Sequence, residues 1–377
     1  MEVGLPSGSR MMNQLARPTN HLLSAAGRWF LDSGIQEAGG GLARYYRCDL
    51  GTKALVSTEI TGYAVSALLF FHQRLEQTEH LESALRGARF LTRTAWDPQL
   101  RVFPFEYSAN GHRPPALAYF FDTGIVIRGL LAASRVSPQA EFRDVAIKAG
   151  RALLADFPSR DGIHPILALP SKRALSYQPN WSAAPGCYQV KSAMAWYELF
   201  EVTGETYFLR AYESALESAL RSEHDFLPGE NDLHKVMDRL HAYAYFLEGL
   251  LPVLNREDCA RTFRKGIDRI AAYVRQIAPL FVRSDVYAQL LRLRLYGKFL
   301  GGIPLDSQAA EHEAQQTAAF QLHSEDAGAS DGFCFGRRRG EFLPFVNPVS
   351  TAFCAQALAL WDDHENNALE APLHTLI

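Results

Sequence analysis

The 377-residue sequence has few of the features that mark several classes of protein. Its five cysteines are scattered singly without a C-x-x-C pair, so we expect neither a disulfide framework nor a structural zinc site. Lysine and arginine (38) nearly balance aspartate and glutamate (41). The net charge of −3 therefore gives no reason to expect a nucleic acid or an anionic membrane as partner. A small ligand or a neutral polymer remains the expected partner.

Long apolar runs are also missing. The sequence nowhere has the roughly 18 consecutive apolar residues of a membrane span, and its first 20 residues lack the apolar core of a signal peptide. We therefore expect a cytoplasmic protein without a membrane segment. Hydrophobic residues nevertheless make up 47% of the chain, which is enough for one large core.

What the sequence does contain is a long-period repetition of helical patterns. Six runs are apolar on nearly every face, which is typical of buried helices; they lie near 58–76, 121–135, 188–202, 234–254, 284–298 and 347–362. Segments between them alternate charges with apolar residues at helical spacing, as in 141–157, 205–223 and 256–277, which indicates half-solvated outer helices. The order outer then inner occurs six times, with almost no competing strand pattern.

The lengths of the connections predict where a binding surface forms. Links from an inner to an outer helix are short, whereas most links in the other direction are long: 35–57, 97–120, 158–188 and 324–346. In a closed ring of antiparallel helices all the long links emerge on one face, together with the first turns of the six inner helices. We expect the site on that face.

The sequence resembles the (α/α)6 toroids of six-hairpin glycosidases, polysaccharide lyases, sugar 2-epimerases and terpenoid-cyclase-like proteins. The residues that carry the resemblance are "EITGY" (59–63), "DTG" (122–124), "TGE" (203–205) and the loops "EAGGGLARYY" (37–46) and "DGFCFGRRRGEFLPF" (331–345). It implies an all-α, single-domain (α/α)6 toroid over residues 17–363, a flexible N-terminal segment (1–16) and a C-terminal tail (364–377). It fixes no reaction.

Four polar residues in the first turns of inner helices are candidate catalytic residues: Glu59, Asp122, His241 and Asp285. Paired carboxyl groups serve as acid, base or nucleophile on sugars, and neutral histidine accepts protons near pH 7. Tyr63 lies four residues after Glu59 and would raise its pKa, whereas the helix N-terminus would keep Asp122 ionised. This predicts Glu59 as the acid and Asp122 as the base.

Structural roles compete with these functions. Aspartate and asparagine are common N-cap residues, so capping explains Asp122 and Asp285 as well as a site does. Capping is the favoured explanation of Asn347, which precedes Pro348. His241 and His234 are seven residues apart with Asp238 between them, but this spacing is a weak metal motif. We expect no metal and no cofactor.

The candidate substrate-binding residues combine aromatic rings, which pack on the apolar faces of sugars, with hydrogen-bonding groups. They are Tyr63, Trp181, Tyr188, Lys191, Arg239, Arg338 and Asn347. Trp181 is the best candidate for a platform because its surroundings are small, polar and rich in proline. Arg338 belongs to the run Arg337–Arg339, which suits an anionic sugar if it faces the site and is otherwise an exposed loop run.

These residues favour a carbohydrate-active enzyme with an oligo- or polysaccharide substrate and a glycoside hydrolase-like carboxyl pair. A polysaccharide lyase or sugar epimerase that relies on His241, Tyr188, Lys191 and Arg239 is an alternative. A non-catalytic glycan-binding or polysaccharide-biosynthesis accessory protein is another. A terpenoid-cyclase-like protein is less favoured because the D-x-D-D and D-D-x-x-D motifs are absent from the sequence. The sugar, the stereochemical outcome and the oligomeric state are not encoded in any recognisable motif.

Overall fold

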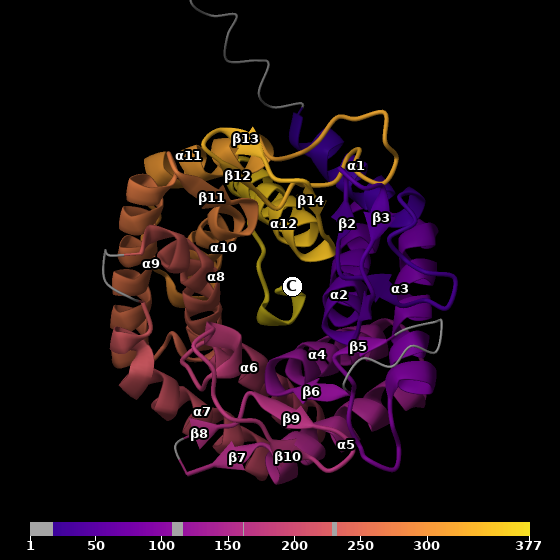
Figure 1. Cartoon of the computed structure of the whole chain (residues 1–377). Helices are drawn as coiled ribbons and strands as arrows, with labels where there is room; N and C mark the ends of the chain where they lie inside the picture. Colours follow the sequence, from indigo (N-terminus) through magenta and orange to yellow (C-terminus); the bar gives the residue numbers. More distant parts are fainter. Residues whose placement is uncertain (1–17, 108–115, 161, 228–231) are drawn as a thin grey trace, which may run out of the picture.

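Helices that alternate between an outer and an inner ring make up most of the protein in the computed structural model, which describes residues 18–107, 116–160, 162–227 and 232–377 (Figure 1). The described residues form twelve α-helices. The inner ones are α2 (Thr58–Leu75), α4 (Phe120–Val136), α6 (Gln189–Thr203), α8 (Leu233–Leu250), α10 (Ser284–Gly301) and α12 (Pro348–Glu365). The outer ones are α1 (Pro18–Asp32), α3 (Thr78–Phe90), α5 (Ala140–Asp156), α7 (Thr206–Ser222), α9 (Glu257–Ile277) and α11 (Ser307–Ala318).

The two rings differ in burial as their sequences predict. Every residue from Pro348 to Leu360 of α12 is buried, whereas α9 buries one apolar face and exposes its charged face. Along the inner ring each helix packs against the next, and α12 packs against α2, so the ring is closed. The predicted (α/α)6 toroid is confirmed.

Two glycines allow the inner helices α2 and α4 to pack closely. A Cβ atom on Gly62 of α2 would lie 2.9 Å from the Cα of Val126 in α4, and one on Gly129 of α4 would lie 2.5 Å from the oxygen of Gly62. Any larger side chain would separate the two helices. This close approach matters for the site because Glu59 and Asp122 lie in the first turns of the same two helices.

Short antiparallel strands in the long links tie the loops of the mouth together. Their sheets are β1 (Leu42–Ala43), β4 (Val56–Ser57) and β5 (Glu106–Tyr107); β14 (Phe345–Val346), β2 (Tyr46–Arg47) and β3 (Thr52–Lys53); β10 (Arg173–Ala174), β9 (Ile166–Ala168) and β6 (Leu117–Tyr119); β11 (Phe281–Arg283), β12 (Gly336–Arg338) and β13 (Glu341–Phe342); and β7 (Pro158–Ser159) with β8 (Gly162–Ile163). Val346 pairs with Tyr46, which joins the last long loop to the first. Strands of two or three residues are too short to produce a periodic pattern in the sequence.

The C-terminal segment enters the ring axis, where it lies at the centre of Figure 1. Leu376 and Ile377 are 2% and 1% exposed. The main-chain oxygen of Ile377 accepts hydrogen bonds from Lys191 Nζ and Arg292 Nη2, both at 3.1 Å. Lys191 and Arg292 in turn pair with Glu248. We call these three fully buried side chains, Lys191, Glu248 and Arg292, the axial layer.

The predicted domain limits at 16 and 363 can be compared with the structure. The N-terminal segment 1–16 lies outside the described residues. The limit at 363 falls inside α12, and the segment that follows packs into the ring. None of the helices in the described ranges has both the length and the apolar character needed to cross a membrane.

Candidate functional site

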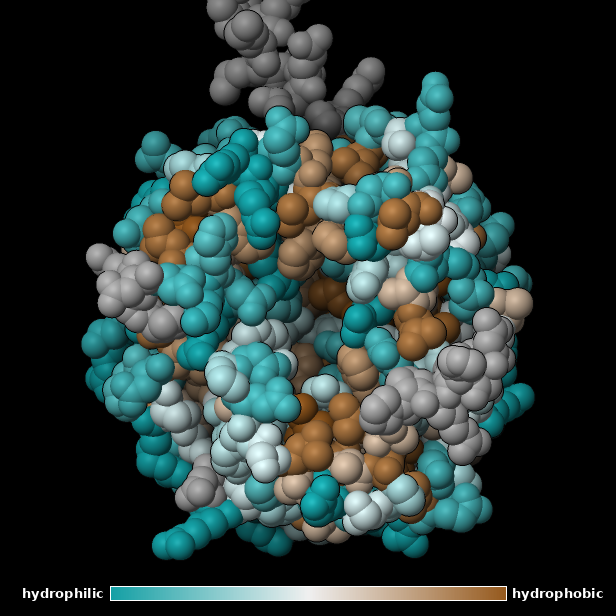
Figure 2. All heavy atoms as spheres, in the orientation of Figure 1, coloured by the Kyte–Doolittle hydropathy of each residue, from teal (hydrophilic) through white to brown (hydrophobic). Residues whose placement is uncertain are grey.

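The inner helices begin around a cavity of about 400 Å³ at the mouth of the ring. Figure 2, in the orientation of Figure 1, shows the surface hollowed near its centre. Most lining residues come from first turns of inner helices and from the long loops, whereas His241 and Tyr245 come from the middle of α8. The lining residues are Arg44, Tyr45, Glu59, Ile60, Phe105, Tyr119, Phe121, Asp122, Pro165, Trp181, Ser182, Tyr188, His241, Tyr245, Arg283, Asp285, Phe335, Asn347 and Val349. The site therefore lies on the face that the link lengths predict.

The structure brings together seven of the eleven predicted site residues. The four candidate catalytic residues all line the cavity, and so do Trp181, Tyr188 and Asn347. The other four, Tyr63, Lys191, Arg239 and Arg338, are not among its lining residues.

Two of these four are buried side chains that do not reach the cavity. Tyr63 is 1% exposed, its ring packs edge-on against Phe353, and its hydroxyl finds no hydrogen-bond partner within the described ranges. Lys191 belongs to the axial layer, where its Nζ lies 2.8 Å from an oxygen of Glu248. Neither side chain is placed for contact with a ligand in the mouth.

The other two lie to the side of the cavity. Arg239 donates a hydrogen bond to the main-chain oxygen of Phe226 at 2.7 Å and stacks over that ring. Arg338 is exposed on β12 with its guanidinium over the ring of Phe281. The position of Arg338 agrees with the alternative interpretation, in which Arg337–Arg339 is an exposed run of charges outside the site. It does not support an anionic substrate.

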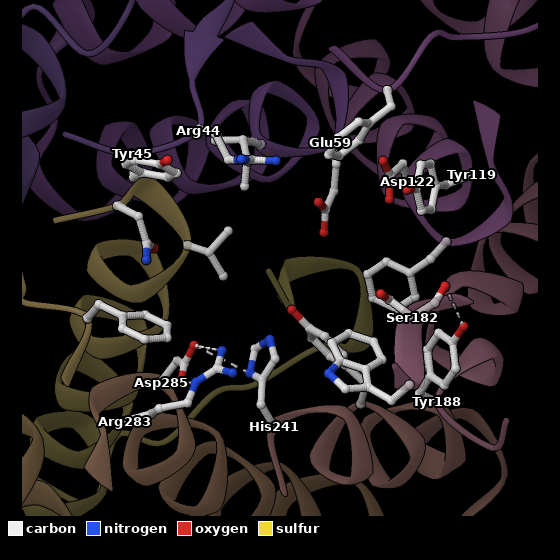
Figure 3. Close-up of a pocket in the computed structure, with 18 of the residues that line it drawn as sticks. Arg44, Tyr45, Glu59, Tyr119, Asp122, Ser182, Tyr188, His241, Arg283 and Asp285 are labelled. Carbon is white, nitrogen blue, oxygen red and sulfur yellow. Dashed lines mark hydrogen bonds and ion pairs between the residues drawn. The ribbon is translucent and has the colours of Figure 1, made fainter. Parts of the chain in front are cut away.

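Glu59 and Asp122 occupy one wall of the cavity side by side (Figure 3). Burial raises the pKa of Glu59 to about 7, although the charge of Arg44 opposes the shift. Burial, and next the charge of Glu59, raise the pKa of Asp122 well above its usual range. Asp122 is 6% exposed, and its Oδ2 has no hydrogen-bond partner among the residues that the structure describes.

The raised pKa of Glu59 agrees with the sequence prediction, whereas that of Asp122 does not. The first turn of a helix stabilises a carboxylate by about 0.3–1 kcal/mol at exposed positions, and burial here outweighs that effect. A second charge close by adds to the cost of ionisation. Near neutral pH the pair therefore retains a proton.

Helix capping does not account for these carboxyl groups. The Oγ of Ser57 caps α2 by accepting from the N–H of Ile60, and Tyr119 is the N-cap residue of α4. Asn347 is the N-cap of α12, as the sequence predicts, and its Oδ1 accepts from the N–H of Ser350 at 2.7 Å. Asn347 both caps its helix and lines the cavity.

His241 and Asp285 lie on the wall that faces the carboxyl pair (Figure 3). Arg283 donates to both oxygens of Asp285, at 2.9 and 2.7 Å, and to Asp238 at 2.8 Å. Arg283 and then His241 hold the pKa of Asp285 below its usual range, against the effect of burial. Burial lowers the pKa of His241 to about 4, so that its ring is neutral near pH 7.

Aromatic rings cover much of the remaining wall. Trp181 lies in a short 3₁₀ turn (Trp181–Ala183), packs edge-on against Tyr188, and donates its indole N–H to Asp238 at 2.8 Å. Phe105 and Tyr119 pack together, with ring centres 4.8 Å apart. A sugar ring presents C–H faces that pack on such surfaces.

Twelve of the nineteen lining residues were not among the predicted site residues, and Arg44, Arg283 and Tyr245 are three of these twelve. Arg44 follows the glycines of the first long loop and pairs with Glu106 at 2.9 Å. Arg283 precedes Asp285 by two residues, and Tyr245 follows His241 by four. The spacing of four residues places the rings of His241 and Tyr245 on one helix face, so Tyr245 could have been identified as a candidate from the sequence.

No group of three histidine, cysteine, aspartate or glutamate side chains in the described ranges is placed to hold a metal ion. His234 lies beside Phe281, with ring centres 5.9 Å apart, while His241 bonds to Gln289. The cysteines of the chain are free thiols.

No protein-family model matches the chain, and no curated protein sequence is significantly similar to it. Solved structures do match. A cellobiose 2-epimerase from Spirochaeta thermophila is 15% identical, with a TM-score of 0.70 over 94% of this chain and 100% of that one. One from Bacillus thermoamylovorans is 12% identical, with a TM-score of 0.71 over 92% and 100%. An unsaturated glucuronyl hydrolase from a Bacillus species is 13% identical, with a TM-score of 0.63 over 93% and 98%. These likenesses show the shared (α/α)6 toroid fold.

Proposed function

We propose that the protein is a carbohydrate-active enzyme that cleaves a glycosidic bond in the mouth of the toroid, with Glu59 and Asp122 as its acid and base. The observation that carries the proposal is the pair of carboxyl groups with raised pKa values on one wall of an aromatic-lined cavity. Such a pair holds one proton to give and one negative charge near neutral pH, which is what glycoside hydrolysis requires.

Within the pair, we assign the proton to Asp122. Its carboxyl group is almost fully enclosed, and Arg44 favours ionisation of the partly exposed Glu59. Asp122 would then protonate the leaving oxygen, while the Glu59 carboxylate acts as base or nucleophile. This order is the reverse of the one predicted from the sequence, because burial decides it.

The substrate we propose is a neutral glycan that enters by its chain end. The arginines at the cavity, Arg44 and Arg283, already pair with Glu106, Asp238 and Asp285. The C-terminal segment fills the axis below the mouth, so a polymer has no path through the ring. The names of structural neighbours, which include cellobiose 2-epimerases and glucuronyl hydrolases, support a sugar substrate.

A second candidate is a sugar epimerase or isomerase. The neutral ring of His241 on the wall opposite the carboxyl pair favours it, because such reactions remove a proton from carbon on one face and return one to it. Epimerisation in heavy water introduces deuterium at the carbon next to the carbonyl of a reducing sugar, whereas hydrolysis does not.

The test is a panel of neutral oligosaccharides and their reducing disaccharides, with product analysis by chromatography and NMR. We expect Glu59→Gln and Asp122→Asn each to lower turnover by at least ~100-fold, the scale of a positioned acid or base. Glu313→Gln is the matched control. Burial also raises the pKa of Glu313 to about 7, but this residue lies in α11, away from the mouth.

The outcomes separate the alternatives. Loss of cleavage in both cavity variants, with full cleavage by the Glu313 variant, supports the proposal. Deuterium incorporation without cleavage favours the epimerase. Binding of a glycan without any turnover, unchanged in the two cavity variants, indicates a glycan-binding protein.

A further inference from the structure

Two groups that can only accept a hydrogen bond lie next to the same nitrogen of the buried His241 ring. Its Nδ1 is 2.8 Å from the Oε1 of Gln289 and 3.4 Å from the Oδ2 of Asp285. Gln289 belongs to α10 and is fully buried. Its role is not evident from the lining of the cavity, since Gln289 is not a lining residue.

The orientation of the Gln289 amide follows from its second contact. Its Nε2 lies 3.4 Å from the main-chain oxygen of His241, and a carbonyl oxygen only accepts hydrogen bonds. The flipped amide would place two oxygens against each other. The amide oxygen of Gln289 therefore faces Nδ1.

The orientation of Asp285 is equally constrained. Arg283 donates to both of its oxygens, which keeps the group a carboxylate without a proton to donate. Two acceptors thus flank Nδ1 of His241, so that Nδ1 carries the hydrogen. In a neutral imidazole the other nitrogen, Nε2, is then an acceptor with a free lone pair.

The charged and titratable groups that face His241 are Asp285, Arg283, Asp238 and Tyr245. Burial, with the charge of Arg283 among the lesser causes, keeps the ring neutral near pH 7. One ring nitrogen of His241 points toward Asp285 and the other toward the cavity, across from Glu59 and Asp122 (Figure 3). The bare nitrogen is thus the one that meets a ligand.

We propose that Gln289 is a positioning residue which, together with Asp285, fixes His241 in the Nδ1–H tautomer and presents an unprotonated Nε2 to the cavity as a hydrogen-bond acceptor. A hydroxyl group of the substrate bound between the two walls would donate its hydrogen bond to Nε2 and so be held in place, while the proton transfers of cleavage remain with Glu59 and Asp122. The use of this acceptor in turnover depends on the proposed function, but the tautomer does not.

The direct test is ¹⁵N NMR of the full chain labelled at histidine, in which long-range proton couplings distinguish a protonated from a bare ring nitrogen. A His241→Asn variant identifies the His241 signals among the twelve histidines. We expect a protonated Nδ1 and a bare Nε2 from pH 6 to pH 8, without any ligand. A bare Nδ1 in the unmodified protein overturns the proposal, whether or not any variant folds.

Variants test the role of Gln289. Gln289→Leu removes one acceptor, and we expect a mixture of tautomers together with a turnover number at least ~10-fold lower at unchanged KM. Gln289→Glu keeps an acceptor at Nδ1, so we expect the Nδ1–H tautomer to be retained and the pH–rate profile to shift to higher pH. Gln356→Leu is the matched control, since this fully buried glutamine of α12 contacts the C-terminal segment instead.

The results separate this proposal from the proposed function. The expected tautomer without activity on any sugar leaves the positioning role of Gln289 intact and rejects the enzyme. If the unmodified protein turns over a sugar and Gln289→Leu keeps both the tautomer and the rate, the role of Gln289 is rejected and the proposed function is not.

Discussion

Two regions along the ring axis bury carboxyl groups, and they differ in what surrounds those groups. In the axial layer, Glu248 is fully buried and contacts Arg292 and Lys191, and its pKa is lowered because these two groups together outweigh the effect of burial. Burial lowers the pKa of Lys191 to about 7, and Arg292 is the larger of the two opposing causes. In the cavity above, no cation in the described part of the chain pairs with Glu59 or Asp122, and their pKa values rise. The compensated carboxylate holds the fold together, while the uncompensated pair retains a proton for chemistry.

The largest effect is expected in the axial layer. Glu248→Gln leaves the buried charge of Arg292 without its partner, and we expect the free energy of unfolding to fall by about 3–5 kcal/mol. Chemical denaturation measures this change. Replacing Lys191, Glu248 and Arg292 together by methionine, leucine and methionine removes the three side-chain charges, and part of the stability should return, while the buried oxygen of Ile377 loses both of its side-chain donors. A single variant as stable as the unmodified protein would contradict the structural role of this layer.

A smaller effect of opposite sign is expected for Asp122→Asn. Because the folded-state pKa of Asp122 is raised, the unmodified protein loses stability as the pH rises through the unfolded value near 4 toward the folded value. The variant avoids this loss. We expect it to be the more stable protein at pH 8, by about 1–3 kcal/mol, with a smaller difference at pH 5. Thermal unfolding at several pH values measures the trend.

Asp285→Asn provides the contrast within the same cavity. The folded pKa of Asp285 is lowered, so its contribution to stability is present above the unfolded pKa near 4 and disappears as the pH falls through the folded value. This variant should be less stable than the unmodified protein at pH 8. If Asp122→Asn and Asp285→Asn changed the stability in the same direction at pH 8, the pairing with Arg283 would not be what distinguishes Asp285 from Asp122.

The smallest effect is expected outside both regions. Arg338 is exposed on β12 and does not line the cavity, so Arg338→Ala should change the free energy of unfolding by no more than about 0.5 kcal/mol. Glycan affinity should also stay the same, for neutral and uronic-acid oligosaccharides alike. Weaker binding of the uronic acids alone would restore the anionic substrate that the arginine run first suggested.

The inner helices were predictable because most of their residues are buried. Their apolar runs are continuous, and the predicted bounds differ from the observed ones by only a few residues. The exception at the end of α8 has a local cause: the helix ends at Leu250, and a 3₁₀ turn (Leu251–Val253) that contains Pro252 follows. Proline lacks the N–H that the next helical hydrogen bond needs.

The depth of a residue along the axis was not predictable in the same way. Glu59 and Tyr63 share a helix face, and so do His241 and Tyr245, yet Tyr63 lies under the floor while Tyr245 lines the cavity. Which residues form the floor depends on neighbouring helices and on the C-terminal segment. The short polar sequence 364–377 has no pattern that indicates insertion into the ring.

By itself the sequence determined the order of the helices, the ring they close and the face on which carboxyl groups, histidine and aromatic rings would gather, because these follow from periodicity and link length. Only the tertiary structure decided which of those groups meet in one cavity and which of them stay ionised. The physical reason is that a pKa depends on burial and on the nearest charges, and for Glu248 and Asp122 those charges come from other helices and loops. Arg283 and His241 lower the pKa of Asp285, and Arg292 and Lys191 lower that of Glu248, whereas burial and the charge of Glu59 raise the pKa of Asp122.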